Sequence, residues 1–510
     1  MAIAPTYSAT QATPPPPAAT APPSISRGAV CLSPGGYANT IVTPKSFHVV
    51  DTSLVPDATF YHPPPPACSI LFMVFLAAPK MAMNMAWAAQ WAAFGPLLET
   101  LLPSWAVQLV QIIGPLTGLL VAPTVGVLSD ACTSTYGRRR PFLLFGAVAS
   151  STCWLVMSYA REIGEAMGDV RGGARQPWTA VWTVLCYIWM DITVNMTQVP
   201  VSLILADFAG DRQVTAASIG QGFSIAGSFC VSGYILFFGP AHESIHAFMF
   251  MLVGVMLGTA LPVCIWAKEE PYTSPADATP RCQQLQQAFA AVYTGLRQLP
   301  RVLVSFCVCF LLIQYGYTAY NGAKGQFFGL HVFGGSADGA NICGKECTGP
   351  QLAYNDGVHL AGGITDTIFN GVGLVYLCIL PWLVRTCGAK RVFTWSILPQ
   401  AMLIAMAFCK VVEMNVTIVV LCAITQNTVF AMQIPVIMHV VGHGPDNQLG
   451  LFAGAFNSAN CAGQLLNFVL ATLLVQTDMG HALPVLVGGI LSLGALLVAQ
   501  FTLQLNMKSL

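Results

Sequence analysis

The chain has 510 residues, of which 55% are hydrophobic and 8% are charged, and its formal net charge is zero. A soluble domain carries about 25% charged residues, so this composition excludes an ordinary soluble protein and indicates a polytopic membrane protein. The neutral balance also argues against nucleic acid as a partner. The 17 cysteines lie mostly in apolar runs, where cysteine acts as a small hydrophobic residue, and they predict no disulfide framework.

The first segment, residues 1–68, is rich in proline and alanine and has proline runs at 14–17 and 63–66. Such a composition cannot bury a core, so we expect a disordered tail. It lacks the basic and apolar regions of a signal peptide.

Twelve apolar segments follow, each long enough to cross a bilayer. The first six lie at 71–97, 105–128, 142–160, 179–206, 215–238 and 247–267. A polar connector, 268–300, precedes the other six, at 302–321, 361–384, 392–412, 416–438, 450–475 and 483–505. We therefore predict an all-α membrane protein with twelve transmembrane helices in two six-helix bundles, at 69–267 and 301–510.

Lysine and arginine residues fix the predicted orientation, because loops rich in them stay in the cytoplasm. The arginines at 138–140, the basic residues of the connector, and those at 385–391 all fall on one side. Both termini, and so the tail, are then cytoplasmic, and 322–358 is an exoplasmic loop. Cys343 and Cys347 in that loop could form a disulfide or remain two thiols.

A short charged loop between the second and third spans is the most distinctive motif. The second span has a face of small residues, Gly114, Gly118, Ala122 and Gly126, that ends at Asp130. Such a face lets another helix approach closely. The loop then continues to Gly137-Arg138-Arg139-Arg140. We predict a cytoplasmic latch built from Gly126, Asp130, Gly137, Arg138 and Arg139.

This loop resembles the signature between helices two and three of the major facilitator superfamily. Its long form, SDACTSTYGRRRPF at 129–142, is similar to that of the sucrose/proton symporter branch, the glycoside-pentoside-hexuronide:cation symporter family. The segments 87–90 and 191–207 resemble the first and fourth spans of the same branch. The resemblance implies the major facilitator fold and proton-coupled symport of sucrose or a related glycoside by alternating access.

Two positions depart from the pattern of that family. The arginine that the family carries in span four, and that serves sugar binding and proton coupling there, is Ser202 in this chain. The acidic pair that ends span seven is replaced by Thr318-Ala-Tyr-Asn321. These departures keep open an uncoupled facilitator.

Asp191 is a charged residue near the middle of span four, where a charge costs about 3 kcal/mol or more. We predict that it is the proton-linked carboxylate and that Lys80 of span one pairs with it, in place of the missing arginine at Ser202. Alternatively, Asp191 belongs to a polar seam between helices, and Lys80 extends to the membrane interface.

Polar side chains on several spans form the predicted substrate site. Amides, phenols and indoles suit a neutral sugar, whose hydroxyls need hydrogen bonds and whose C–H face stacks on aromatic rings. The alternative is that the amides only hold helices together. The predicted substrate-binding residues are Asn84, Trp87, Gln90, Asn195, Gln198, Gln314, Tyr317, Asn457, Asn460 and Gln464.

No motif indicates an enzyme, a cofactor or a metal site. The expected partners are a sugar, protons and the lipid bilayer. Three alternatives remain: an uncoupled facilitator, a transporter of another small neutral solute, and a transport-dead sensor or scaffold. We expect the plasma membrane, with a vacuolar or other internal membrane as the alternative.

Overall fold

The computed structural model describes residues 68–507, apart from 131, 171–175, 210–212, most of 270–296, 345, 442–448 and 506. Almost all of the predicted tail at 1–68 and most of the predicted connector at 268–300 therefore lie outside the described residues.

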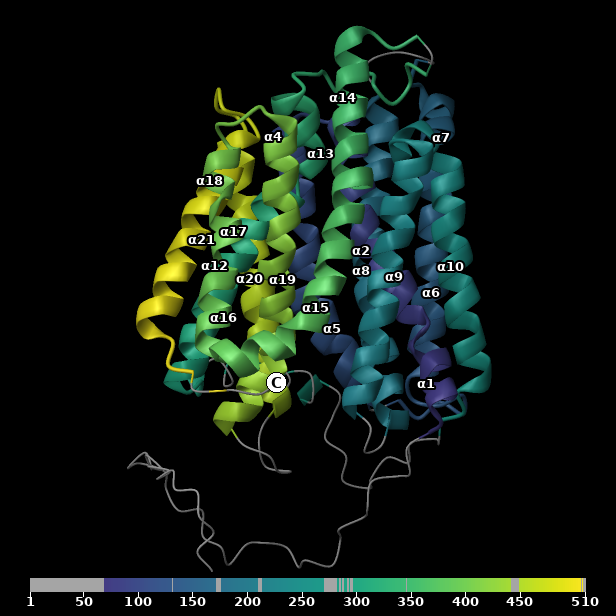
Figure 1. The fold of residues 1–510 in the computed structure, drawn as a ribbon. Helices are drawn as coiled ribbons and strands as arrows, with labels where there is room; N and C mark the ends of the chain where they lie inside the picture. The colour runs from purple at the N-terminus through teal and green to yellow at the C-terminus, as the bar shows by residue number, and fades with distance from the viewer. Residues whose placement is uncertain are drawn as a thin grey trace, which may run out of the picture. The chain divides into compact units, whose positions relative to one another are not determined.

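The first half of the chain forms helices that match the first six predicted spans (Figure 1). Pro79 begins a new helix within the first span, as proline favours the first turn. The elements are α1 (Ile70–Ala77), α2 (Pro79–Ala89), the π-helix η2 (Gln90–Phe94), α3 (Gly95–Leu101), α4 (Ser104–Gln111), α5 (Ile113–Asp130), α6 (Arg140–Ser158), α7 (Ala160–Met167), α8 (Pro177–Ala209), α9 (Gln213–Phe238), the 3-10 helix η3 (Ala241–Glu243) and α10 (Ile245–Trp266).

The second half begins after the connector and contains two further π-helices. Its elements are α12 (Arg301–Asn321), α13 (Lys324–Gln326), the π-helix η4 (Phe327–Val332), α14 (Gly349–His359), the π-helix η5 (Leu360–Thr365), α15 (Asp366–Cys387), α16 (Ala389–Ser396), α17 (Leu398–Ala401), α18 (Leu403–Met406), α19 (Val412–Val441), α20 (Leu449–Leu474) and α21 (Ala482–Thr502).

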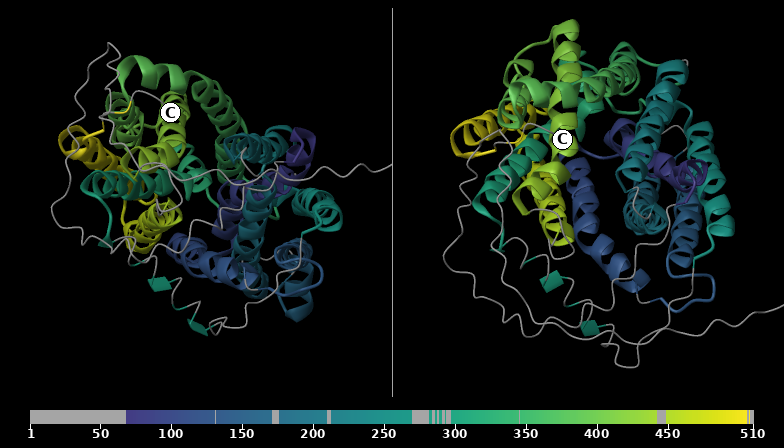
Figure 2. Two further views of the ribbon diagram at one scale, coloured as in Figure 1. Left: turned by 90° about the horizontal axis from the view of Figure 1, so that it is seen from below. Right: turned by 60° about the horizontal axis from the view of Figure 1, so that its bottom comes forward.

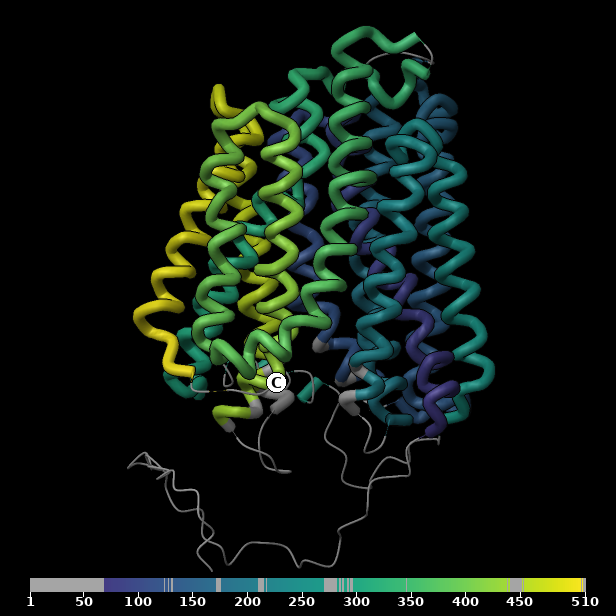
Figure 3. Tube along the Cα trace, viewed as in Figure 1, coloured from purple at the N-terminus to yellow at the C-terminus, as the bar shows by residue number. Residues whose placement is uncertain are grey.

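The eighth span is longer than predicted. Helix α14 begins at Gly349 rather than at 361 and continues through η5 into α15 as one element (Figure 3). A capping box starts it, in which Thr348 and Gln351 satisfy each other's free backbone N–H groups. The prediction of a loop over the whole of 322–358 is therefore wrong, since α13, η4 and α14 occupy much of it. Cys343 and Cys347 form a disulfide in the remaining part.

Ten helices of the described residues are long and apolar enough to cross a membrane. The ninth predicted span is broken into α16, α17 and α18, and the eleventh, α20, carries the predicted amides, which lower its mean hydropathy. The protein is thus an integral, multi-pass membrane protein of the all-α class.

Each buried hydrophobic cluster draws its residues from one half of the chain. One cluster runs from Met73 to Ala267, and three others fall between Leu303 and Met507. Figure 2 shows the helices of the two halves from the end that carries the basic loop. The domain boundaries at 69–267 and 301–510 stay a prediction.

Candidate functional site

Two adjoining cavities lie between the halves of the chain, with volumes of about 290 and 300 Å³. Their walls come from α2, η2, α5, α8 and α9 of the first half, and from α12, α13, α15, α19 and α20 of the second half. Both cavities share one set of lining residues: Asn84, Trp87, Trp91, Phe430 and Gln464.

Nine of the ten predicted substrate-binding residues line these cavities. The exception is Gln90, which is fully buried and donates a hydrogen bond to the hydroxyl of Tyr187 at 2.6 Å. The nine residues are Asn84, Trp87, Asn195, Gln198, Gln314, Tyr317, Asn457, Asn460 and Gln464. The spacing of these residues predicts that those of each span lie on one face of its helix. In the structure, these faces line the two cavities. Their binding roles stay a prediction.

Hydrogen bonds within the first half hold the polar side chains in place. The Trp87 indole N–H donates to Oε1 of Gln198 at 2.8 Å, which fixes the ring against the cavity. The amide of Asn84 donates to Oγ of Ser228 at 2.6 Å, and the amide of Asn195 donates to Oγ1 of Thr117 at 3.0 Å. An indole face beside amide groups can stack on a sugar ring and bind its hydroxyls.

In the second half, a chain of amides supports the cavity wall. Gln314 donates to Gln426 at 3.0 Å, Gln426 donates to Gln400 at 2.8 Å, and Gln400 donates to Oγ of Ser492 at 2.9 Å. Sequence analysis identified only Gln314. Because Gln400 and Gln426 lie on different helices from Gln314, no spacing rule connects them with it.

An ion pair between Lys324 and Asp366 also lines the first cavity, and sequence analysis missed it. The side chains of Lys324 and Asp366 are only 5% and 17% exposed, respectively. The Lys324 ammonium also donates to Oδ1 of Asn321 at 3.1 Å. The signal for Asp366 was present, because it is the one acidic residue in the predicted span 361–384. Lys324 falls just beyond the predicted span seven, so the sequence did not indicate that its side chain is buried inside the protein.

Asp191 lies behind the wall of the second cavity rather than on its surface. It is fully buried beside the side-chain amide of Gln90, and no ion pair between described residues includes it. A Cβ atom added to Gly114 would lie 3.6 Å from its Oδ2 and 3.0 Å from Nε2 of Gln90. Gly114 lines the cavity, so Asp191 is next to a lining residue that has no side chain.

The predicted pair of Lys80 and Asp191 is absent from this structure. Lys80 packs on α9, where a Cβ atom added to Gly220 would lie 2.8 Å from its Cδ. Asp191 lies beside Gln90, ten positions further along the first span, which is about 15 Å of helix. The two side chains are thus apart in this structure, and their roles in proton coupling stay a prediction. Ser202 is exposed and lines neither cavity.

The basic loop, residues 137–140, meets two acidic residues that the latch prediction did not include. Nη2 of Arg138 and Nε of Arg139 lie 2.9 and 3.5 Å from Oδ2 of Asp207. The backbone N–H groups of Arg139 and Arg140 donate to Oε2 of Glu269 at 2.9 and 3.0 Å.

The latch residue Gly137 has a φ of +105°, and a Cβ there would lie 2.6 Å from Oε2 of Glu269. Nη1 of Arg139 also donates to Oγ of Ser129 at 2.7 Å. Gly126 packs on α8, where its added Cβ would contact Val199 at 4.0 Å. The side chain of Asp130 lies outside the described residues, so its place in the latch stays a prediction.

Hydrogen bonds between described residues of the two halves all lie at the opposite end of the helices, the predicted exoplasmic end. Nε2 of His242 lies 2.8 Å from Oδ1 of Asn355, whose amide donates to Glu243 at 2.7 Å. The hydroxyl of Tyr354 donates to the backbone oxygen of Pro96 at 3.0 Å. We call these the exoplasmic contacts.

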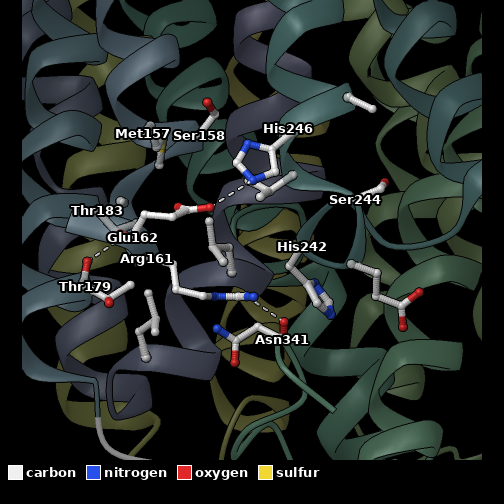
Figure 4. Close-up of a pocket in the computed structure, with 16 residues that line it drawn as sticks. Met157, Ser158, Arg161, Glu162, Thr179, Thr183, His242, Ser244, His246 and Asn341 are labelled. Atoms are coloured by element: carbon white, nitrogen blue, oxygen red, sulfur yellow. Dashed lines mark hydrogen bonds and ion pairs between the residues drawn. The ribbon is translucent and has the colours of Figure 1, made fainter. Parts of the chain in front are cut away.

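A pocket of about 320 Å³ lies beside the exoplasmic contacts (Figure 4). Arg161 crosses it and donates to the backbone oxygen of Asn341 in the second half at 2.8 Å. Burial, together with the nearby charge of Arg161, lowers the pKa of His242 to about 4, although the bond to Asn355 acts in the other direction. Burial raises the pKa of Glu243.

Known proteins resemble this chain in sequence and in fold. The sucrose transport protein SUC4 of Arabidopsis thaliana is 35% identical over 231 residues, which are 44% of this chain and 40% of that protein. The sucrose transport protein SUT3 of Oryza sativa subsp. japonica is 26% identical over 362 residues, 66% of this chain and 68% of that protein. The match therefore spans less than half the length of SUC4.

Solved structures share the fold at low sequence identity. A D-xylose–proton symporter has a TM-score of 0.56 and 15% identity, with 86% of this chain and all of that chain covered. A variant of the nucleoside transporter NupG has a TM-score of 0.57 and 12% identity, with 85% of this chain and all of that chain covered. Residues 66–353 match the family described as MFS/sugar transport protein, and the chain belongs to that family.

Proposed function

We propose that this protein is a secondary transporter that carries a sugar, sucrose or a related glycoside, together with protons by alternating access. The observation that carries the proposal is the pair of cavities between the halves, lined by nine predicted residues with amide, phenol and indole groups. Two relatives whose names describe sucrose transport support the substrate class.

The described state suits alternating access. The two halves bind each other by hydrogen bonds at the predicted exoplasmic end, and these contacts would close the cavities on that side. Transport would then require these contacts to break and the halves, at 69–267 and 301–510, to rock about the cavities. The basic loop would act as the latch on the cytoplasmic side when the exoplasmic side opens.

Asp191 is the proposed proton-carrying carboxylate. A buried carboxylate that is not paired with a cation is costly when charged, and uptake of a proton during part of the transport cycle removes that cost. Asp191 is next to Gly114, which lines the cavity, so a modest movement of α5 against α8 would admit water. The proton-coupling role of Lys80 stays a prediction, because its side chain does not meet Asp191 in this state.

Uptake into proteoliposomes tests the function. Purified protein should accumulate labelled sucrose, or another glycoside of a sugar panel, when a proton gradient is imposed, and a protonophore should abolish accumulation. A facilitator would instead only equilibrate the sugar, an outcome that Ser202 in place of the family's arginine favours. A transport-dead scaffold would bind no sugar.

We propose the plasma membrane as the site of action, which fluorescence of a tagged chain would test.

A further inference from the structure

The Lys324–Asp366 ion pair lines the first of the two cavities, the one of about 290 Å³. Among the described residues that line the two cavities, these two alone carry charge. The carboxylate of Asp366 is partly open to the cavity, and Lys324 bridges it to Asn321. The cavity thus offers a neutral combination of one cation and one anion.

The ion pair lies next to two π-helices, close to the first half of the chain on one side and to aromatic rings on the other. Lys324 precedes η4 and Asp366 follows η5, and π-helical turns occur frequently at functional sites. Beside Lys324, a Cβ atom added to Gly325 would lie 2.5 Å from Pro96 of the first half. Aromatic rings flank the other side, where Tyr317 stacks on Phe369 at 6.1 Å.

We propose that this pair binds hydroxyl groups of the transported sugar, with the Asp366 carboxylate as acceptor and the Lys324 ammonium as donor. The inference rests on the proposed function and deepens it. Hydrogen bonds to charged groups are stronger than those to neutral groups, so the pair would contribute much of the sugar affinity. Because its net charge is zero, it favours a neutral polyol over an anion or a cation.

A purely structural pair, which would join α13 to α15, makes a different prediction. Removing one of the two charges would destabilise the protein, because the other charge would remain buried alone. Removing both charges together would restore stability. The double variant Lys324→Gln, Asp366→Asn therefore separates the two roles.

The test is sucrose exchange by proteoliposomes without a pH gradient, with the best sugar of the panel used if it is not sucrose. We expect Asp366→Asn to raise the KM for exchange at least about ten-fold, since a charged hydrogen bond is worth that much. The double variant should unfold at the same temperature as the wild type but keep the raised KM. Glu413→Gln, which removes an exposed acid at the start of α19, should leave KM unchanged.

Sugar-dependent change in the fluorescence of Trp87 and Trp91, which line the same cavity, measures binding even when transport is lost. A wild-type KM in either the double variant or Asp366→Asn would overturn the inference while the proposed function stands. If Asp366→Asn kept its KM but lost gradient-driven accumulation, the pair would couple protons and not bind sugar. Absence of exchange in the wild type would overturn both.

Discussion

Two aspartates in the spans, Asp191 and Asp366, differ in their surroundings. Asp366 faces Lys324 and the cavity, whereas Asp191 forms no ion pair with a described residue and lies next to Gln90 and Gly114. A paired carboxylate can stay charged while it holds hydroxyl groups. An unpaired one suits a group whose charge is temporary. The two residues are therefore expected to fail in different ways when changed.

Asp191→Asn should abolish sugar accumulation driven by a pH gradient and spare sugar exchange, because asparagine keeps the shape but cannot carry a proton. Accumulation and exchange, measured on the same proteoliposomes, check this. The KM for exchange should stay near the wild-type value, in contrast to Asp366→Asn. Accumulation against the sugar gradient by this variant would reduce Asp191 to a polar contact between helices and favour the facilitator.

At the residue scale, the sequence predicted many of the polar residues that line the cavities, but it did not predict the ion pair between Lys324 and Asp366. Periodicity places Asn457, Asn460 and Gln464 on one face of a helix, and that face lines the cavity. No periodicity shows that Lys324 and Asp366 meet, because they lie on separate elements, 42 residues apart. Lys80 and Asp191 were paired on their predicted depth alone, and this structure places them beside different neighbours.

At the scale of elements, the start of α6 depends on an acid that comes from beyond the end of α10. Oε2 of Glu269 accepts the backbone N–H groups of Arg139 and Arg140, the first free donors of α6. An anion at a helix N-terminus is stabilised by these donors and by the helix dipole. Gly137 allows the approach, because any side chain there would collide with Glu269.

Gly137→Ala should therefore destabilise the protein more than Gly388→Ala. Both glycines have positive φ, at +105° and +86°, so both alanines add strain of about 1–2 kcal/mol. Only Gly137 has an atom close to the added Cβ, and Gly388 has none within 4 Å. Thermal unfolding in detergent should show the larger loss for Gly137→Ala.

Hydrogen exchange gives the local measure of the same contact. The amides of Arg139 and Arg140 should exchange faster in Gly137→Ala and in Glu269→Ala, and should be unaffected in Gly388→Ala. Equal losses of stability in the two glycine variants, with no change in these amides, would mean that Glu269 has no part in holding the loop.

The lengths of most spans could be predicted to within about four residues, since apolar runs and caps are local signals. The eighth span was the main exception. Its first turns, from Gly349 to His359, are polar and look like a loop, but they fold as α14 because they contact the first half of the chain. Such tertiary contacts override local composition.

At the scale of the whole molecule, the predicted orientation puts the disulfide loop outside and the basic loop inside. An impermeant thiol reagent applied to intact cells after mild reduction should label Cys343 and Cys347, and it should leave Cys132 unlabelled. A Cys132→Ser variant provides the control for signal from the basic loop. Labelling of Cys132 from outside would reverse the topology and the assignment of the exoplasmic contacts.

The contacts between the halves could not be predicted from sequence. His242 and Asn355 lie 113 residues apart, on a short 3-10 turn and on a helix that looks like a loop. Only the packing of the two halves brings them together. Their chemistry nevertheless makes the closed exoplasmic end sensitive to pH.

Acid on the exoplasmic side should open that end of the protein. Burial holds the pKa of His242 at about 4 in the closed state, whereas an exposed histidine has a pKa of about 6.5. The open state therefore binds the proton more tightly. The closed state loses stability as pH falls below about 6.5, and the loss is complete below about 4. Between pH 7.5 and pH 5, the open-to-closed ratio should rise roughly 30-fold, which is about 2 kcal/mol.

Energy transfer between dyes on unnatural amino acids at positions 167 and 352, both exposed on opposite halves near this end, measures the opening. His242→Gln keeps a hydrogen-bond donor for Asn355 but cannot titrate. The distance between the two dyes in this variant should therefore be independent of pH over this range. Glu243 acts in the opposite sense, because burial raises its pKa and acid then favours the closed state. Glu243→Gln should therefore steepen the response. An unchanged pH response in His242→Gln would assign the opening to another group.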